Sequence, residues 1–183
     1  MIRNRRVSHG GPQLGDLHKY LLRDPVFLGS LILWGLNDHV FKYAWPGPWS
    51  GKLSDVTSLV CAPVIVFMIV FKLIGLYRQT RNQKGHRSTV REAYCLMAAC
   101  ALLMAVIMVG INVNETWASV YRVGLGYVQW PLLCLKYYFT EGVIPPLSRV
   151  KLTIDPTDGW TAPCSLISLV ILKRAIRTIN KDC

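Results

Sequence analysis

The sequence predicts an all-α, polytopic integral membrane protein: a helical bundle of four spans, arranged as two parallel two-helix repeats with an added interfacial or re-entrant segment. Three observations predict this class. The 183 residues are 52% hydrophobic, with a mean hydropathy of +0.32, and the apolar residues gather in runs. Lysine and arginine flank these runs and give a net charge of +11. A polar stretch that opens one apolar run also recurs later in the chain.

The recurring stretch reads KLSDVTSLVCAP at 52–63 and KLTIDPTDGWTAP at 151–163, with Asp, Thr, Ala and Pro in the same order. A second pair, GLNDH at 35–39 and GINVN at 110–114, closes the apolar run that precedes each copy. The chain therefore reads as a duplicated unit of apolar helix, Asn-containing segment, Lys-to-Asp segment and second apolar helix.

The first half begins with a basic tail at 1–24, which we place in the cytoplasm. The first span covers about 25–43, and its purely apolar part is short against the roughly 20 residues that cross a bilayer. A re-entrant element is the alternative there. Residues 44–54 read as a Pro- and Gly-rich loop, because both residue types interrupt helices. The second span follows at about 56–76.

The second half begins after the basic stretch 77–92, which the positive-inside rule places in the cytoplasm. The third span is 93–113 and the fourth is 158–172, ahead of a basic C-terminal cluster. These spans predict an N-in, C-in protein of a bacterial inner membrane, with both polar copies on the extracytoplasmic side. Residues 117–139 read as an amphipathic interfacial or re-entrant helix. A fifth crossing is the alternative, and it would move the basic C-terminus outside.

The repeated polar residues form the candidate site, an acid-rich extracytoplasmic cleft that recognises a cation or a small polar solute. Its candidate binding residues are Asn37, Asp38, Lys52, Asp55, Asn112, Glu115, Lys151, Asp155 and Asp158. Five of them have a plainer interpretation. Asp55 and Asp155 precede apolar residues and suit helix caps, Lys52 and Lys151 suit interface anchors, and Asp38 can pair with Lys42 on one helix face.

A divalent metal is the cofactor that these residues could hold, with Asp55, Asp155 and Asp158 as candidate oxygen ligands. His39 is then the candidate catalytic base of a membrane-embedded, metal-assisted hydrolase. A structural or assembly protein with no catalytic site is the third alternative. Basic residues beside apolar runs favour the lipid bilayer and anionic headgroups as partners, not nucleic acid. A homo-oligomer is compatible with all three hypotheses.

Several blocks of the chain resemble an uncharacterised group of small bacterial polytopic membrane proteins. The blocks are LNDH at 36–39, GKLSD at 51–55, YRVGLG at 121–126 with QWP at 129–131, and DPTD at 155–158. The resemblance implies the membrane fold. It carries over no activity and no site.

Overall fold

The computed structural model describes residues 14–45, 47–81, 88–147, 150 and 155–182. All regular secondary structure in these residues is helical, as the sequence predicts. The chain forms two compact units. Unit one comprises residues 1–105 and 163–183, and unit two comprises residues 106–162.

Unit one contains a short amino-terminal pair, η1 (Leu14–Asp16) and α1 (Leu17–Leu22), and then α2 (Pro25–Leu36). One turn of π-helix, η2 (Asn37–Phe41), and the short α3 (Lys42–Ala44) continue α2. The remaining elements that contribute to unit one are α4 (Pro48–Thr80), the first part of α5 (Val90–Val113), the end of the 3-10 helix η3 (Pro156–Leu166), and α7 (Ile167–Asp182).

Helix α4 begins earlier than the sequence suggested. Pro48 occupies its first turn, where the missing N–H leaves no hydrogen bond unmade, and Gly47 precedes it. The prediction of a loop over 44–54 was therefore wrong for most of that range. As a result Asp55 lies inside α4 and does not cap it.

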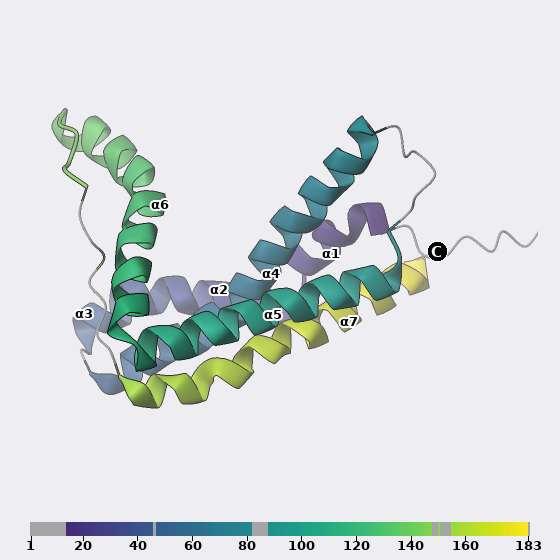
Figure 1. The fold of residues 1–183 in the computed structure, drawn as a ribbon, viewed down its shortest axis with the longest axis horizontal. Helices are drawn as coiled ribbons and strands as arrows, with labels where there is room; N and C mark the ends of the chain where they lie inside the picture. Colours follow the sequence, from purple (N-terminus) through teal and green to yellow (C-terminus); the bar gives the residue numbers. More distant parts are fainter. Residues whose placement is uncertain (1–13, 46, 82–87, 148–149, 151–154, 183) are drawn as a thin grey trace, which may run out of the picture. The chain divides into compact units, whose positions relative to one another are not determined.

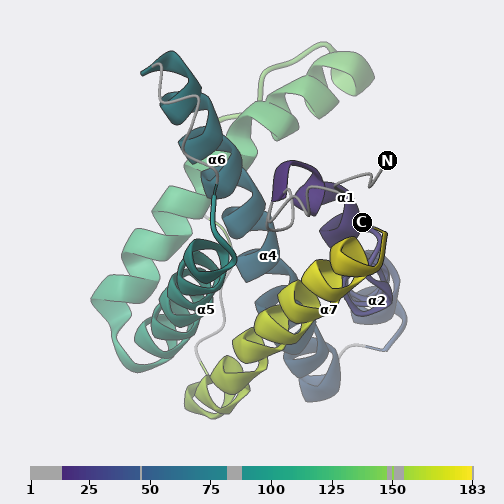
Figure 2. The same cartoon turned by 90° about the vertical axis from the view of Figure 1, so that its right-hand side faces the viewer.

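The core of unit one lies where α1, α2, α4, α5 and α7 meet. Helix α2 packs on α4, and α1 packs on α7 (Figure 1, Figure 2). The cluster includes Leu17, Phe27, Phe67, Met97 and Ile171, all nearly inaccessible to solvent. Helix α7 buries one apolar face and exposes a basic one, as expected for an amphipathic helix.

Unit two contains the end of α5, helix α6 (Glu115–Glu141) and the start of η3. The Asn114 side chain caps α6 by accepting from the backbone N–H groups of Thr116 and Trp117 at 2.9 and 3.2 Å. Gly142 ends the helix with φ of 69°, a left-handed conformation that glycine adopts without strain. The predicted helix at 117–139 is thus part of one longer helix, which continues through Pro131.

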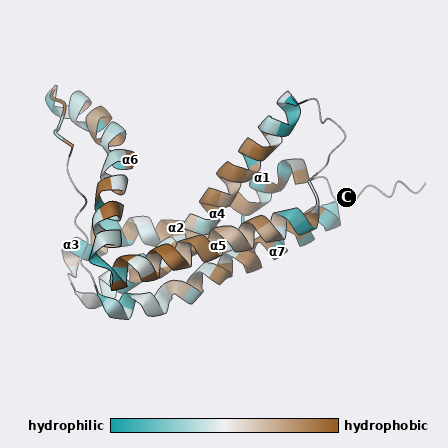
Figure 3. Cartoon of the chain, viewed as in Figure 1, coloured by the Kyte–Doolittle hydropathy of each residue, from teal (hydrophilic) through white to brown (hydrophobic). Residues whose placement is uncertain are grey.

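Two helices are long and apolar enough to cross a membrane, by length and composition: Trp49–Thr80 of α4 and Val90–Val113 of α5 (Figure 3). The prediction of four spans is corrected to two among the described residues. The segment 25–43 is not long enough as a membrane span, because its α-helix ends after 12 residues in the π turn. The segment 158–172 fails because it joins a 3-10 helix to the first residues of the amphipathic α7.

Candidate functional site

The π turn η2 places Asn37 against the start of α4. Asn37 is 0% exposed, and its side-chain amide donates to the backbone carbonyl of Ser50 at 2.6 Å. Since that carbonyl can only accept, the amide nitrogen must face it, and Oδ1 faces the other way. Asn37 Oδ1 is buried and has no hydrogen-bond partner among the described residues. Buried polar atoms are nearly always paired, so an orphaned acceptor in a π turn, a feature frequent at functional sites, is unusual.

Asp38 lies beside Asn37 and is held by two side chains. Lys42 Nζ lies 2.6 Å from Asp38 Oδ1, which confirms the predicted pairing four residues apart. The Ser54 hydroxyl of α4 donates to the same oxygen at 2.9 Å, and Lys42 Nζ lies 3.4 Å from Ser54 Oγ. The three side chains therefore form a closed polar triangle that joins the π turn to α4.

We name these five residues, Asn37, Asp38, Lys42, Ser50 and Ser54, the Asn37 site. The sequence analysis had not included Ser50 and Ser54 among its candidates. A signal for them was available: they stand four residues apart, on one face of a helix, in the polar stretch that follows the π turn.

The other candidates in unit one lie close by on the chain but are arranged differently. Lys52 and Asp55 are half-buried near the start of α4. Thr57 is buried and its hydroxyl donates back to the Leu53 carbonyl at 2.7 Å, a local contact within the helix. His39 is exposed, and it makes no hydrogen bond or ion pair with any described residue. His39 and Asp55, the candidate base and a candidate metal ligand, therefore make no hydrogen bond or ion pair with each other.

Unit two brings Asn112 and Asp155 together. Asn112 is buried, its amide nitrogen donates to the Met108 carbonyl at 2.9 Å, and its Oδ1 accepts from the backbone N–H of Asp155 at 3.2 Å. The Asp155 carboxylate accepts from both the backbone N–H and the hydroxyl of Thr157, at 2.9 and 2.8 Å. Asp155 is thus the cap of η3, which confirms the capping interpretation for this residue.

Two further predicted residues, Glu115 and Asp158, belong to unit two. Glu115 is exposed and pairs with Arg122 at 2.9 Å, where solvent screening leaves a weak interaction. The backbone N–H of Asp158 donates to the Asp155 carbonyl at 2.9 Å. Lys151 lies outside the described residues.

The metal hypothesis receives no geometric support. Within the part of the chain that the structure describes, no three His, Cys, Asp or Glu side chains are grouped as a metal site requires. Asp55 belongs to unit one, and Asp155 and Asp158 belong to unit two. The hydrolase that depended on such a group stays a prediction.

Comparison with protein-family models, with curated proteins and with solved structures finds no match to this chain. The function must therefore be argued from the geometry.

Proposed function

We propose that the chain is an integral membrane protein in which α4 and α5 cross the bilayer, and that the Asn37 site binds a cation or a small polar solute. The observation that carries the site is the buried, unpartnered Oδ1 of Asn37.

The surface of the two long helices supports membrane insertion. Only 33% of the apolar window of α4 and 28% of that of α5 is buried inside the protein. The core helix of a water-soluble protein buries most of its apolar surface, whereas a membrane helix exposes it to lipid. Aromatic side chains mark one end of α4, where Trp45 and Trp49 are 72% and 86% exposed, as at a membrane interface. Arg78 and Arg81 mark the other end.

The packing of unit one supports an N-in, C-in orientation. Helix α2 runs antiparallel to α4, since Phe27 lies near Cys61 and Asn37 lies near Ser50. Helix α1 consequently lies beside the basic end of α4. The Tyr20 hydroxyl donates to the Asp182 carboxylate at 3.0 Å, so the end of α7 lies there too. The positive-inside rule assigns this end to the cytoplasm and the Asn37 site to the opposite face. A bacterial inner membrane is the setting we propose.

The chemistry of the Asn37 site suits a cation or a hydrogen-bond donor. Asn37 Oδ1 is an acceptor with free lone pairs, and amide oxygens are common ligands of hard cations. Asp38, the next residue in the chain, carries a negative charge that pairs with Lys42. We also propose that Asn112 and Asp155 form the corresponding part of a duplicated unit. In each copy the asparagine side chain bonds the backbone of the segment that follows, at Ser50 or at Asp155.

Membrane insertion is tested by extraction and by reporter fusions. The protein should stay in the membrane fraction after alkaline extraction and dissolve only in detergent. A reporter fused after Lys84 should be active in the cytoplasm, and one fused after Gly47 outside it. A soluble protein, or the inverse reporter pattern, would contradict the proposed placement.

Binding at the Asn37 site is tested by thermal unfolding of detergent-purified protein in Na⁺, K⁺, NH₄⁺, Mg²⁺ or Ca²⁺, with choline chloride holding the ionic strength constant. A cation at 100 times its Kd stabilises the folded state by about 2.7 kcal/mol, which raises Tm. Asn37→Leu should abolish the increase, whereas the exposed Asn180→Leu should retain it. An increase that persists in Asn37→Leu would remove the site from the proposal.

A structural or assembly role is the second candidate. The observation that favours it is the closed triangle, since Asp38 already has Lys42 and Ser54 as partners. Under this role no cation in the series changes Tm. Asp38→Asn is then less stable than wild type, by the same amount in every salt.

A further inference from the structure

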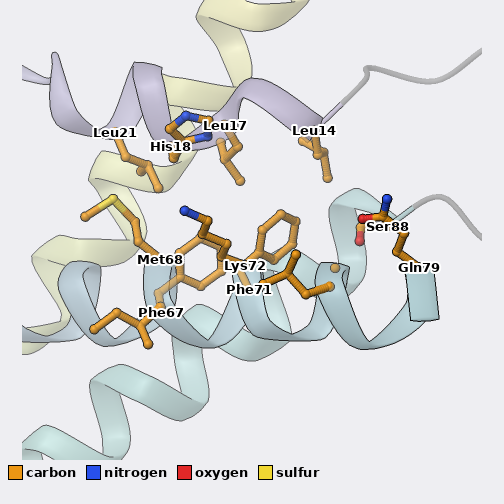
Figure 4. Close-up of a pocket in the computed structure, with 13 residues that line it drawn as sticks. Leu14, Leu17, His18, Leu21, Phe67, Met68, Phe71, Lys72, Gln79 and Ser88 are labelled. Carbon is orange, nitrogen blue, oxygen red and sulfur yellow. The ribbon is translucent and has the colours of Figure 1, made fainter. Parts of the chain in front are cut away.

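A cavity of about 630 Å³ lies between α1 and the carboxyl-terminal half of α4, at the opposite end of α4 from the Asn37 site (Figure 4). Its walls are mostly apolar, with Leu17 and Leu21 on one side and Phe67 and Phe71 on the other. The volume is within the range of roughly 300–1,000 Å³ that is usual for small-molecule sites. The cavity therefore suits a flexible apolar group.

Four polar residues also line the cavity, namely His18, Lys72, Gln79 and Ser88, and Lys72 is the one with a permanent positive charge at neutral pH. Lys72 lines the cavity, and Figure 4 shows its side chain extending from α4 towards α1. Lys72 makes no hydrogen bond or ion pair with any described residue. The two acids in residues 14–23 and 67–92 are already paired, Asp16 with Lys19 and Glu92 with Arg78. A ligand that carries negative charge would complement Lys72.

The charge of the segments around the cavity also favours an anionic ligand. Residues 14–23, 67–81 and 88–92 together contain six lysines and arginines against two acids. Anionic lipids concentrate on the cytoplasmic leaflet, and lysine and arginine near that surface attract them. This end of α4 is the one that the proposed orientation places there.

We propose that the α1–α4 cavity holds one acyl chain of an anionic phospholipid, whose phosphate is bound by Lys72. The apolar walls replace neighbouring lipid tails around the chain. The lysine supplies a charge-assisted hydrogen bond to a phosphate oxygen. The position of the phosphate bound at Lys72 fixes the depth of α1 relative to the cytoplasmic headgroups. This inference rests on the proposed membrane insertion.

The test uses the full chain in a non-ionic detergent, with dioleoyl phosphatidylglycerol or dioleoyl phosphatidylcholine added, and reads bound lipid by native mass spectrometry. Wild type should bind phosphatidylglycerol about tenfold more tightly than phosphatidylcholine, because both offer a phosphate oxygen but the choline cation neutralises the second lipid and opposes Lys72. Lys72→Gln should lose that preference. The control Lys173→Gln, an exposed lysine on α7, should keep it.

A second variant fills the cavity. Gly75 lines it, and a Cβ built there meets no atom within 4 Å, so Gly75→Leu adds side-chain volume from an open position. Gly75→Leu should weaken the binding of both lipids. Gly29→Leu, at an equally open position on α2, should leave the binding of both unchanged. Equal affinity for both lipids, or a Gly75→Leu variant that binds as Gly29→Leu does, overturns the inference. If the protein still requires detergent, the proposed membrane insertion stands even then.

Discussion

The side-chain oxygen of Asn112 accepts a hydrogen bond from the backbone N–H of Asp155, 43 residues further along the chain, at 3.2 Å. Asn112 ends α5, and Asp155 caps the 3-10 helix that leads into α7. One buried amide therefore connects the end of one long helix to the start of the last helical segment. Both residues were candidates for a ligand site, and in the structure the side chain of each makes hydrogen bonds to backbone groups.

Replacing Asn112 tests that role. Asn112→Leu removes the acceptor and leaves the Asp155 N–H without its partner, which should lower the free energy of unfolding by about 1–3 kcal/mol. The Asp155 amide should also exchange with deuterium faster than in wild type. Asn180→Leu, at an exposed position, should change stability by less than about 0.5 kcal/mol. Unchanged exchange at Asp155 in Asn112→Leu would contradict the contact.

Asp24 is the cap of α2, and its removal should weaken unit one. Its carboxylate accepts from the backbone N–H groups of Val26 and Phe27 at 2.9 and 3.2 Å. Asp24→Ala should lower the free energy of unfolding by about 1 kcal/mol, and by no more than about 2. Asp24→Asn retains an acceptor and should lose only a few tenths, as measured by chemical unfolding in detergent. Arg174 Nη1 also lies 4.0 Å from Asp24 Oδ2, so equal losses in the two variants would mean that this charge pairing matters more than the cap.

The two long apolar helices and the all-helical class were predictable, because hydropathy and the absence of alternation carry that information locally. The cap at Asp155 was also predictable from the Asp-Pro pair. The same pair at Asp24 and Pro25 carried the same signal, and the sequence analysis treated it only as the start of an apolar run. In both places the proline suits the first turn and the aspartate precedes it.

The errors arose where tertiary contacts decide the local structure. Pro48 signals a break and also a helix start, and only packing of α2 against α4 distinguishes them. Apolar residues at 25–36 read as part of a span until the π turn ends the α-helix at Leu36. The basic residues of α7 were predicted as a C-terminal cluster that follows the fourth span, yet the recurring pairs of buried and exposed residues there identify an amphipathic helix.

The candidate site was predictable in part. Asn37, Asp38 and the pairing with Lys42 follow from spacing along one helix. The contribution of Ser50 and Ser54 depends on the antiparallel contact between α2 and α4, which periodicity does not encode. The burial of Asn37, and hence its orphaned oxygen, likewise follows only from the fold.

The exposed pair Asp16 and Lys19 gives a prediction about pH. Their charged atoms lie 2.8 Å apart, and the hydrogen bond from Lys19, followed by its charge, holds the pKa of Asp16 below its ordinary value of 3.8. Because the folded pKa is the lower one, the pair stabilises α1 above pH 3.8 and loses this effect as the pH falls through the folded pKa. Lys19→Gln should raise the Asp16 pKa towards 3.8 in a carboxyl NMR titration. An unchanged pKa in Lys19→Gln would show that the contact is not populated in solution.

Alanine should change the stability of unit two in opposite directions at two glycines, Gly110 near the end of α5 and Gly124 within α6. A Cβ added at Gly110 would overlap the indole ring of Trp117, whereas one added at Gly124 meets nothing within 4 Å. Gly110→Ala should therefore destabilise unit two by about 1–3 kcal/mol, as overpacking does. Gly124→Ala should stabilise it by up to about 1 kcal/mol, because alanine is the better helix former. Thermal unfolding followed by Trp117 fluorescence, with other tryptophans replaced by phenylalanine, measures both.

The Gly110 effect should depend on the ring that it meets. In the double variant Gly110→Ala/Trp117→Leu the smaller side chain leaves room for the added methyl group. Alanine at position 110 should then lower the free energy of unfolding by less than it does beside Trp117. Circular dichroism follows the unfolding, because the tryptophan is absent from this variant. If alanine at Gly110 proves as harmless as alanine at Gly124 in the wild-type background, the close contact between the end of α5 and Trp117 does not exist in solution.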